Sequence, residues 1–304
     1  MSYKICPLCK FKNKKKIIVA NRVYGDKKKR RKFFLCENCE VRYMHPRLTK
    51  IQEKKFYKKE FESFMNKRSG TSGGWLNAEK HVKKNYETFQ RRIKYLKKYS
   101  PKKNKMDICE FGCSSGFMLY PFKKKGHNCF GVEPSGFFKN YLKKNEIQII
   151  EEENFSKKNN QKFDLITHFF VLEHVSDPIN FLNNQLNFLK KGGKIIFEIP
   201  NVSDPLHTLY NIDSFEKFYW SIAHPWYFSY KSLQFLLKKL KKPFKILLDQ
   251  RYDLSNHLTW LMEDKPGGIK KYSKLLGPKL EKKYKDNLYL KKKCDTLVGI
   301  ITNS

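Results

Sequence analysis

Residues Glu110 to Phe117 read EFGCSSGF, a glycine-containing turn between two apolar runs. The run before the turn, MDICEF, is short and strand-like, whereas the run after it, FMLYPFKKK, has helical spacing. Gly112 permits a tight turn, and Gly116 lets the following helix pack close to the strand. The N-terminus of such a helix offers free backbone N–H groups to a ligand. The stretch therefore predicts the start of a ligand-binding βαβ unit.

A second strand-like run, NCFGVE, ends in Glu133, 21 residues after Gly112. A carboxylate at this position can accept hydrogen bonds from two ribose hydroxyls. Dinucleotide-binding turns carry a middle glycine that lets the pyrophosphate approach the backbone, but this turn has Ser114 there. The pattern therefore favours a ribose-containing ligand without phosphates over a dinucleotide.

Strand-like and helix-like runs alternate through the rest of the chain. Five further strand-like runs follow, namely IQII, KFDLITHF, KIIFEIP, FKILLD and TLVGIIT. Helix-like runs between them include GFFKNYLKK, PINFLNNQLNFLKK, which we expect the following GG to stop, and SYKSLQFLLKKL. This alternation predicts a doubly wound, mostly parallel, Rossmann-like α/β sheet. Residues 251–293 fit no element clearly.

Four of the eight cysteines form two Cys-x-x-Cys pairs, CPLC and CENC, near the N-terminus. Two such pairs on a hairpin place four thiolates around one zinc ion, and a closed set of four ligands indicates a structural role. The predicted ligands are Cys6, Cys9, Cys36 and Cys39. We expect the remaining four cysteines to be small buried residues.

Three regions are predicted on these patterns. Residues 1–48 form a zinc ribbon, residues 49–100 a helical linker or lid, and residues 101–304 the Rossmann-like domain. The stretch 50–100 reads as two helices joined by the loop SGTSGGW.

The chain of 304 residues carries a formal net charge of +35, with 64 basic and 29 acidic residues. Only nine of the basic residues are Arg, and the Lys residues are scattered in short runs. Specific nucleic-acid contacts are made mainly by Arg side chains. The net positive charge therefore has two possible explanations, compositional drift and a polyanionic or membrane-surface partner. The sequence has no long apolar span and no signal-peptide pattern, and we expect a cytoplasmic protein without a transmembrane segment.

The stretch DICEFGCSSGFMLYPFKKKGHNCFGVEPS resembles the cofactor loop and second strand of class I S-adenosylmethionine-dependent methyltransferases. The stretch FDLITHFFVLEHVSDPINFLNNQLNFLKKGGKIIFEIPN resembles their fourth strand, following helix and fifth strand. LEH followed by a helix start at Asp177-Pro178 is typical of the subgroup that methylates small molecules. CENCEVRYMHPRLTKIQEKKFY resembles the zinc ribbon fused to a branch linked to sugar or polysaccharide biosynthesis.

The resemblance implies S-adenosylmethionine as the cofactor, with structural Zn²⁺ in the ribbon. It places the methionine part of the cofactor on the loop and the ribose on Glu133. Arg92 would reach the cofactor carboxylate, Phe169 would pack beside the cofactor, and residues 152–155 would border the adenine. The implied cofactor residues are Arg92, Glu110, Gly112, Ser114, Gly116, Glu133, Phe155 and Phe169.

Methyl transfer from a sulfonium is an in-line displacement that needs an aligned acceptor and, for a protonated acceptor, a base. His174 and His224 are the candidate bases because imidazole titrates near neutral pH. His174 follows the fourth strand, where open α/β sheets bind ligands, but it could instead orient the next loop. His224 lies among aromatic residues that could wall an acceptor pocket or form ordinary core. Glu173 could orient an imidazole or an acceptor hydroxyl, or cap a helix.

The sequence therefore predicts methyl transfer to an O, C or N atom of a small molecule, a sugar or polysaccharide precursor that can be nucleotide-linked or polymeric. One alternative is an RNA methyltransferase that uses the ribbon and the basic surface. The other is a non-catalytic module that keeps the zinc and has lost the chemistry.

Overall fold

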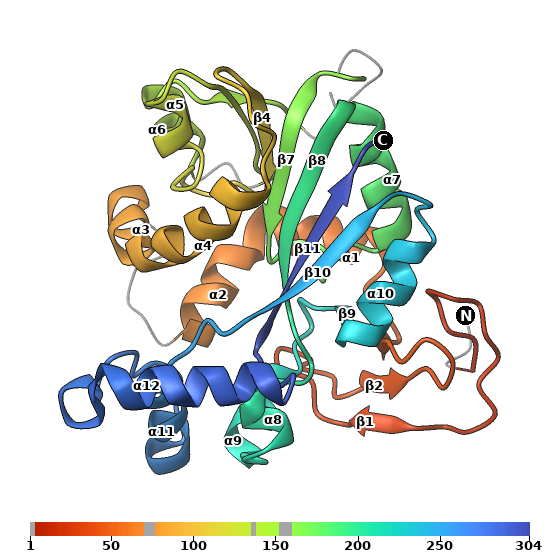
Figure 1. The fold of residues 1–304 in the computed structure, drawn as a ribbon. Coiled ribbons are helices and arrows are strands. Elements are labelled where there is room, and N and C mark those ends of the chain that lie inside the picture. The colour runs from red at the N-terminus through yellow and green to blue at the C-terminus, as the bar shows by residue number, and fades with distance from the viewer. Residues whose placement is uncertain (1–3, 70–76, 135–137, 152–159) are drawn as a thin grey trace.

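The protein is described here from a computed structural model, which covers residues 4–69, 77–134, 138–151 and 160–304. A seven-stranded sheet runs through its centre, in the order β10-β11-β8-β7-β4-β5-β6 (Figure 1). Only β11 runs antiparallel to its neighbours. The strands are β4 (Asp107–Phe111), β5 (Asn128–Val132), β6 (Gln148–Ile149), β7 (Phe163–Phe169), β8 (Leu189–Pro200), β10 (Phe244–Asp249) and β11 (Thr296–Thr302). The predicted doubly wound, mostly parallel Rossmann-like fold is confirmed.

The strand order reverses next to β4. From β4 the chain adds β5 and β6 on one side, and then returns to add β7 and β8 on the other. Ligands of open α/β sheets bind at the carboxyl ends of the strands on either side of such a switch point. The loop that follows β4 is therefore in the position that the fold reserves for a ligand.

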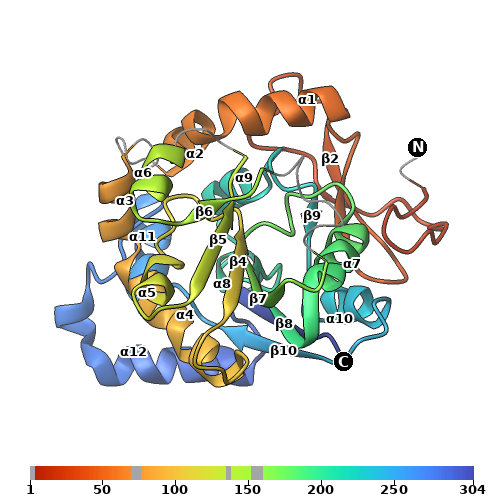
Figure 2. The same ribbon diagram turned by 90° about the horizontal axis from the view of Figure 1, so that it is seen from above.

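Helices cover both faces of this sheet (Figures 1 and 2). One face carries α4 (Tyr86–Tyr99), α5 (Tyr120–Lys123) and α6 (Lys139–Lys144), and the other carries α7 (Pro178–Phe188) and α10 (Tyr230–Lys238). Leu96 and Leu142 are fully buried on the first face, and Leu182 and Leu236 on the second. Each helix presents one apolar side, because its residues at helical spacing are drawn out of water by the sheet.

One detail of the sequence prediction is wrong. We expected the Gly192-Gly193 pair to end the helix before it, but α7 ends at Phe188 and both glycines lie within β8. Gly192 has a φ of +76°, and the pairing of β7 with β8 shifts register between Phe163 and Leu165. The glycines thus form an irregular start to the strand, which propensity alone does not distinguish from a helix stop.

The N-terminal region forms a second, four-stranded sheet in the order β1-β2-β3-β9. Its strands are β1 (Ile18–Ala20), β2 (Lys32–Leu35), β3 (Arg42–His45) and β9 (Trp226–Tyr227). β9 comes from the long connection after β8, so the last strand of this sheet is supplied by the part of the chain that forms the central sheet. Phe33, Met44, Trp220, Tyr227 and Trp260 are buried together in the core between the two regions.

The remaining helices surround the carboxyl ends of the strands. They are α1 (Lys50–Lys55), the π-helix η1 (Phe56–Glu60), α2 (Phe61–Ser69), α3 (Ala78–Lys84), α8 (Pro205–Thr208), α9 (Asp213–Tyr219), α11 (Leu254–Glu263) and α12 (Ser273–Leu290). Residues 251–293, which the sequence left unplaced, thus form a helical hairpin that lies across this end of the sheet (Figure 1). Among the described residues, no helix has the length and apolar character needed to cross a bilayer.

Candidate active site and metal centre

The loop after β4 has left-handed backbone at both of its glycines. Gly112 has a φ of +66°, and a Cβ there would lie 2.7 Å from Val171. Gly116 has a φ of +71°, and a Cβ there would lie 2.7 Å from both Leu142 and Ile147. Both the conformation and the close packing require glycine, as the sequence pattern predicts.

Ser114, the residue between the two glycines, also adopts a left-handed conformation, with a φ of +45°. Its backbone N–H donates a 2.6 Å hydrogen bond to Oε2 of Glu133, at the end of β5. The loop and the acidic residue are therefore in direct contact. The serine adopts a left-handed backbone that favours glycine, at a cost of about 1 kcal/mol.

Ser115 makes a contact that the sequence did not reveal. Its Oγ lies 2.9 Å from Nδ1 of His81 on α3, and both side chains are buried. Burial lowers the pKa of His81 to about 4, and the nearby charge of Lys84 adds to this effect. The neutral ring thus joins the N-terminal helices to the loop. A histidine at helical spacing in a Lys-rich helix gave no signal for this role.

Glu110 is almost fully buried at the end of β4, and its Oε2 has no hydrogen-bond partner among the described residues. Burial holds the pKa of this carboxyl well above its usual range, and the neighbouring Arg92 partly offsets the effect. A buried acceptor without a donor is costly, so the position suits a ligand that brings a donor or a cationic group.

Arg92 on α4 lies beside Phe169, with its guanidinium carbon 4.1 Å from the centre of the ring. Its Nε donates a 2.8 Å hydrogen bond to Glu198 near the end of β8. Glu198 also accepts from Arg91 and Tyr95, and this carboxylate is completely buried. Arg92 is therefore near the predicted cofactor position with one nitrogen already occupied. Phe155 lies outside the described residues.

The three candidate catalytic residues lie together, although 50 residues of chain separate His174 from His224. Glu173, His174 and His224 each place one ligand-type atom within 4.8 Å of the others, and the two imidazole centres are 4.6 Å apart. Glu173 and His174 occupy the turn after β7, and His224 the turn before β9. The trio thus lies at the carboxyl ends of the strands.

The hydrogen bonds fix which nitrogen of each ring carries the proton. Nδ1 of His174 lies 2.7 Å from the Ala223 carbonyl, which can only accept, so Nδ1 donates. Nδ1 of His224 lies 3.2 Å from the hydroxyl of Tyr227, whose own proton is donated to the Tyr219 carbonyl. In the neutral ring, Nε2 of both histidines therefore carries a free lone pair.

Burial controls the charges of this trio. It lowers the pKa of His174 to about 4 and holds the pKa of His224 well below its usual range, so both rings are neutral at neutral pH. It raises the pKa of Glu173 to about 8, and both carboxyl oxygens of Glu173 lack a hydrogen-bond partner among the described residues. The site thus combines two free lone pairs with an unsatisfied carboxyl group.

Tyr57, on the π-helix η1, was missed by the sequence analysis. Its hydroxyl donates a 2.8 Å hydrogen bond to the Ala223 carbonyl and lies 3.2 Å from Nδ1 of His174. Single π-turns often occur at functional sites, but nothing in the sequence FYKKE distinguishes one from an α-helix.

The aromatic residues around His224 are core, which was the second of the two interpretations. Tyr219, Trp220, Trp226, Tyr227 and Phe228 are each no more than 6% exposed. They pack between the N-terminal sheet and the rest of the protein rather than lining an open wall.

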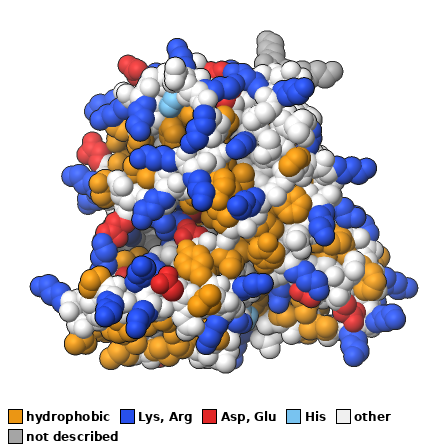
Figure 3. Space-filling view, in the orientation of Figure 1, with side chains coloured by type: hydrophobic (Ala, Val, Ile, Leu, Met, Phe, Trp, Pro, Cys, Tyr) orange, Lys and Arg blue, Asp and Glu red, His pale blue; other side chains and the backbone are white. Residues whose placement is uncertain are grey.

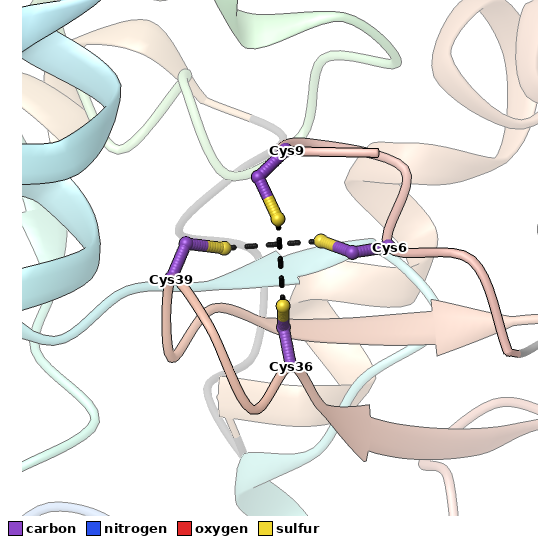
Figure 4. Close-up of side chains that lie close together, drawn as sticks. All are labelled: Cys6, Cys9, Cys36 and Cys39. Carbon is purple, nitrogen blue, oxygen red and sulfur yellow. Dashed lines mark hydrogen bonds between the residues drawn. The ribbon is translucent and has the colours of Figure 1, made fainter. Parts of the chain in front are cut away.

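The four N-terminal cysteines converge on one point (Figure 4). Their sulfur atoms lie within 4.8 Å of one another, with Sγ–Sγ distances of 3.8 Å for Cys6–Cys39 and 3.5 Å for Cys9–Cys36. A tetrahedral ion with Zn–S bonds of about 2.3 Å requires sulfur atoms about 3.8 Å apart, whereas a disulfide requires about 2 Å. The geometry fits a tetrahedral zinc site.

Comparisons with known proteins agree with this fold. A family described as methyltransferase domain matches residues 81–240. A ubiquinone biosynthesis O-methyltransferase of Coxiella burnetii is 27% identical over 158 residues, which are 50% of this chain and 65% of that protein. A tRNA U34 carboxymethyltransferase of Helicobacter hepaticus is 30% identical over 106 residues, which are 30% of this chain and 34% of that protein. The chain thus spans less than two thirds of the length of these relatives.

Two solved structures share the fold. A SAM-dependent methyltransferase from Archaeoglobus fulgidus aligns with a TM-score of 0.50 and 18% identity, covering 80% of this chain and 100% of that one. A putative Haloferax volcanii methyltransferase, solved with the Trm112 activator, aligns with a TM-score of 0.51 and 13% identity, covering 80% and 97%. With the family match over more than half of its length, the chain belongs to the methyltransferase domain family.

Proposed function

We propose that the protein transfers the methyl group of S-adenosylmethionine to a small hydroxylated acceptor of the sugar or polysaccharide-precursor class. The trio of Glu173, His174 and His224 carries this proposal. It gathers two free Nε2 lone pairs and an unsatisfied buried carboxyl group in one small space. Such a set needs several hydrogen-bond donors from its ligand, and neighbouring hydroxyls of a sugar would supply them.

In this proposal one imidazole accepts the proton of the attacking hydroxyl. The cofactor supplies an activated methyl group on a sulfonium centre. His174 is held by the Ala223 carbonyl and His224 by Tyr227, so both rings are already oriented before the acceptor binds. Glu173 would accept from a second hydroxyl and align the acceptor. Fixed orientation of this kind is a main source of catalytic rate.

The cofactor would lie across the loop after β4. Gly112, Ser114 and Gly116 would hold the methionine part and Glu133 the ribose, while the unsatisfied Oε2 of Glu110 would accept from the cofactor's amino group. Phe169 would pack on the cofactor, and Arg92 would reach the carboxylate only if its contact with Glu198 is shared. The contact between Ser114 and Glu133 supports this placement.

We further propose that Cys6, Cys9, Cys36 and Cys39 hold a structural Zn²⁺. The match between the observed and required sulfur separations supports it. All four ligand positions are filled by protein, so the ion would stabilise the N-terminal sheet and would not enter the reaction.

The test is a methyltransfer assay with a panel of nucleotide-linked sugars and free monosaccharides. Replacing His174 or His224 with Asn should lower turnover by about 100-fold, the usual value of a general base, and leave cofactor affinity unchanged. His127→Asn, at the amino-terminal end of β5, is the control. Since the pKa of His174 is about 4, turnover should stay level from neutral pH to about pH 5 and then fall.

Three outcomes would overturn the proposal. Full activity in both histidine variants would show that neither histidine acts as the general base. Loss of activity on chelation, with recovery on adding Mg²⁺ or Mn²⁺, would show that the reaction depends on a metal ion and not on a histidine base. These hard cations do not restore a four-thiolate site, so the recovery could not come from the four cysteines.

The third outcome concerns RNA. A tRNA-modifying relative and the charge of +35 favour RNA as the second candidate acceptor. Lys and Arg side chains are spread over the visible face rather than gathered in one groove (Figure 3). Methylation of RNA with strongly salt-dependent binding, and none of any sugar, would establish RNA as the acceptor.

A further inference from the structure

The hairpin of α11 and α12 carries an apolar tip. The tip consists of the end of α11, the connecting residues 264–272 and the first turn of α12. Four large apolar side chains in it are solvent-exposed, namely Leu261 at 45%, Met262 at 69%, Ile269 at 52% and Leu275 at 85%. Isolated exposed apolar residues are normal, but four within fifteen residues of one turn indicate a surface with a partner.

The tip is held in place by its own hydrogen bonds. The backbone N–H of Lys270 donates to Asp253 at 2.8 Å, and that of Tyr272 donates to Ser255 at 3.1 Å. Gly268 packs so closely on Thr259 that no Cβ would fit. The inner side of the hairpin is therefore ordered and packed. The outward position of the four apolar residues follows from this packing and not from a loose loop.

Lysines outnumber acidic residues around these apolar side chains, with Lys265 and Lys271 paired to Glu263 and Lys270 paired to Glu87. From position 261 to 293 the chain has eleven Lys residues and four acidic residues. Lys265, Lys270, Lys271 and Lys274 lie within the tip itself, and Lys279 follows on α12. In the space-filling view, hydrophobic side chains gather between Lys and Arg side chains along the lower edge, where α11 and α12 lie (Figure 3).

We propose that this tip docks on an anionic membrane surface. Its apolar side chains would enter the boundary between headgroups and acyl chains, and the lysines would contact anionic headgroups. A second copy of the chain fits less well, because two such tips would bring four lysines against four. A nucleic acid would pair with the lysines but would leave the apolar side chains in water.

The position of the tip determines which side of the protein would face the membrane. The hairpin follows β10 and lies across the carboxyl ends of the strands, where Glu173, His174 and His224 also lie (Figure 1). A docked protein would therefore have the acceptor side of the sheet near the membrane. The docking itself does not depend on which acceptor is methylated.

The experiment is co-sedimentation of the full chain with vesicles. We expect binding to vesicles rich in phosphatidylglycerol, and at least tenfold weaker binding to vesicles of phosphatidylcholine alone. The double variant Met262→Ser, Leu275→Ser should bind phosphatidylglycerol vesicles about tenfold more weakly. Lys274→Gln with Lys279→Gln should weaken binding and reduce its salt dependence.

The matched control is Ile51→Ser on α1, which removes an apolar side chain that is 84% exposed and lies outside the hairpin. It should bind as the unchanged protein does. Every changed side chain is exposed, and equal melting temperatures would show that the fold is intact. Equal binding by the double variant, or no preference for anionic vesicles, would overturn the proposal. So would a dimer of the unchanged protein that the double variant dissociates, since the tip would then be an interface between copies.

Discussion

At the level of single residues, the shape of the loop after β4 depends on three positions, Gly112, Ser114 and Gly116. All three have a positive φ, and only Ser114 pays for it with a side chain. The serine N–H is the group that contacts Glu133. The loop therefore depends on backbone conformation and on one carboxylate more than on the identity of its middle side chain.

We expect Glu133→Ala to weaken S-adenosylmethionine binding by about 10- to 100-fold, since hydrogen bonds to a charged group contribute about 1.5–3 kcal/mol. Ser114→Gly should leave the affinity within about twofold, because glycine adopts the same left-handed backbone freely. Isothermal titration calorimetry measures both. Normal cofactor binding by Glu133→Ala would show that the loop has been assigned the wrong ligand.

The buried carboxyl group of Glu173 should make the stability of the protein depend on pH. Its pKa is about 8 in the folded protein, above the usual value for glutamate, because burial disfavours the charged form. The folded state therefore binds its proton more tightly than the unfolded state. This contributes stability that is present below about pH 4.5 and is lost as the pH rises through about 8.

In Glu173→Gln this loss should disappear. Urea unfolding of the unchanged protein and the variant, at several pH values from acidic to alkaline, should show a difference in free energy of unfolding that changes by about 5 kcal/mol across the range. Parallel pH curves for the two proteins would mean that the carboxyl group is solvated or paired. The comparison cancels all other titrating groups, which the two proteins share.

At the level of elements, sequence patterns predicted what is periodic and local. The seven predicted strands, MDICEF, NCFGVE, IQII, KFDLITHF, KIIFEIP, FKILLD and TLVGIIT, are all present, because strands within a sheet leave continuous apolar runs. The π-helix that carries Tyr57, and the pairing of β9 with β3, were not predicted. Both depend on contacts between residues more than 100 positions apart, for which a local pattern has no signal.

The same limit applies to the candidate site. His174 and His224 could be chosen from the sequence as titratable residues after strands, but their contact could not. The ring of His224 is placed by Tyr227, which is placed in turn by β9. Arg92 was expected to be free for the cofactor, and its ion pair with Glu198 arises from the docking of α4 on the sheet.

The packing of α4 on the sheet should contribute strongly to the free energy of unfolding. Glu198 is completely buried and pairs with both Arg91 and Arg92 on α4. Glu198→Gln should lower the free energy of unfolding by about 3–5 kcal/mol, because the buried Arg92 loses its counter-charge and Arg91 is left with Asp249 alone. Asp213→Asn, which breaks the exposed pair with Lys217 on α9, should leave it nearly unchanged. Chemical denaturation distinguishes the two, and equal effects would contradict the burial of the Glu198 cluster.

At the scale of the whole molecule, direct contacts join the N-terminal sheet to the turn that carries the candidate catalytic residue His174. The indole of Trp226 in β9 donates a 2.8 Å hydrogen bond to the Val175 carbonyl, directly after His174. Arg47, just after β3, stacks on Trp226 at 3.8 Å and donates to the Ser176 carbonyl. The turn that carries His174 is thus held by residues of the N-terminal region, which also carries the four cysteines.

Loss of the zinc should therefore separate catalysis from cofactor binding. Cys36→Ser removes one of the four proposed ligands, and we expect it to abolish zinc binding, as measured by elemental analysis. The cofactor loop after β4 does not contact the N-terminal sheet through any described hydrogen bond, so S-adenosylmethionine affinity should stay within about threefold. Turnover should fall by at least about tenfold, because small displacements of His174 and His224 misalign the acceptor.

Cys129→Ser is the control, since Cys129 is a buried thiol outside the cluster. A zinc-free variant with normal turnover would show that the ribbon does not position the trio, and a variant that loses both activities together would show that the ribbon supports the whole fold.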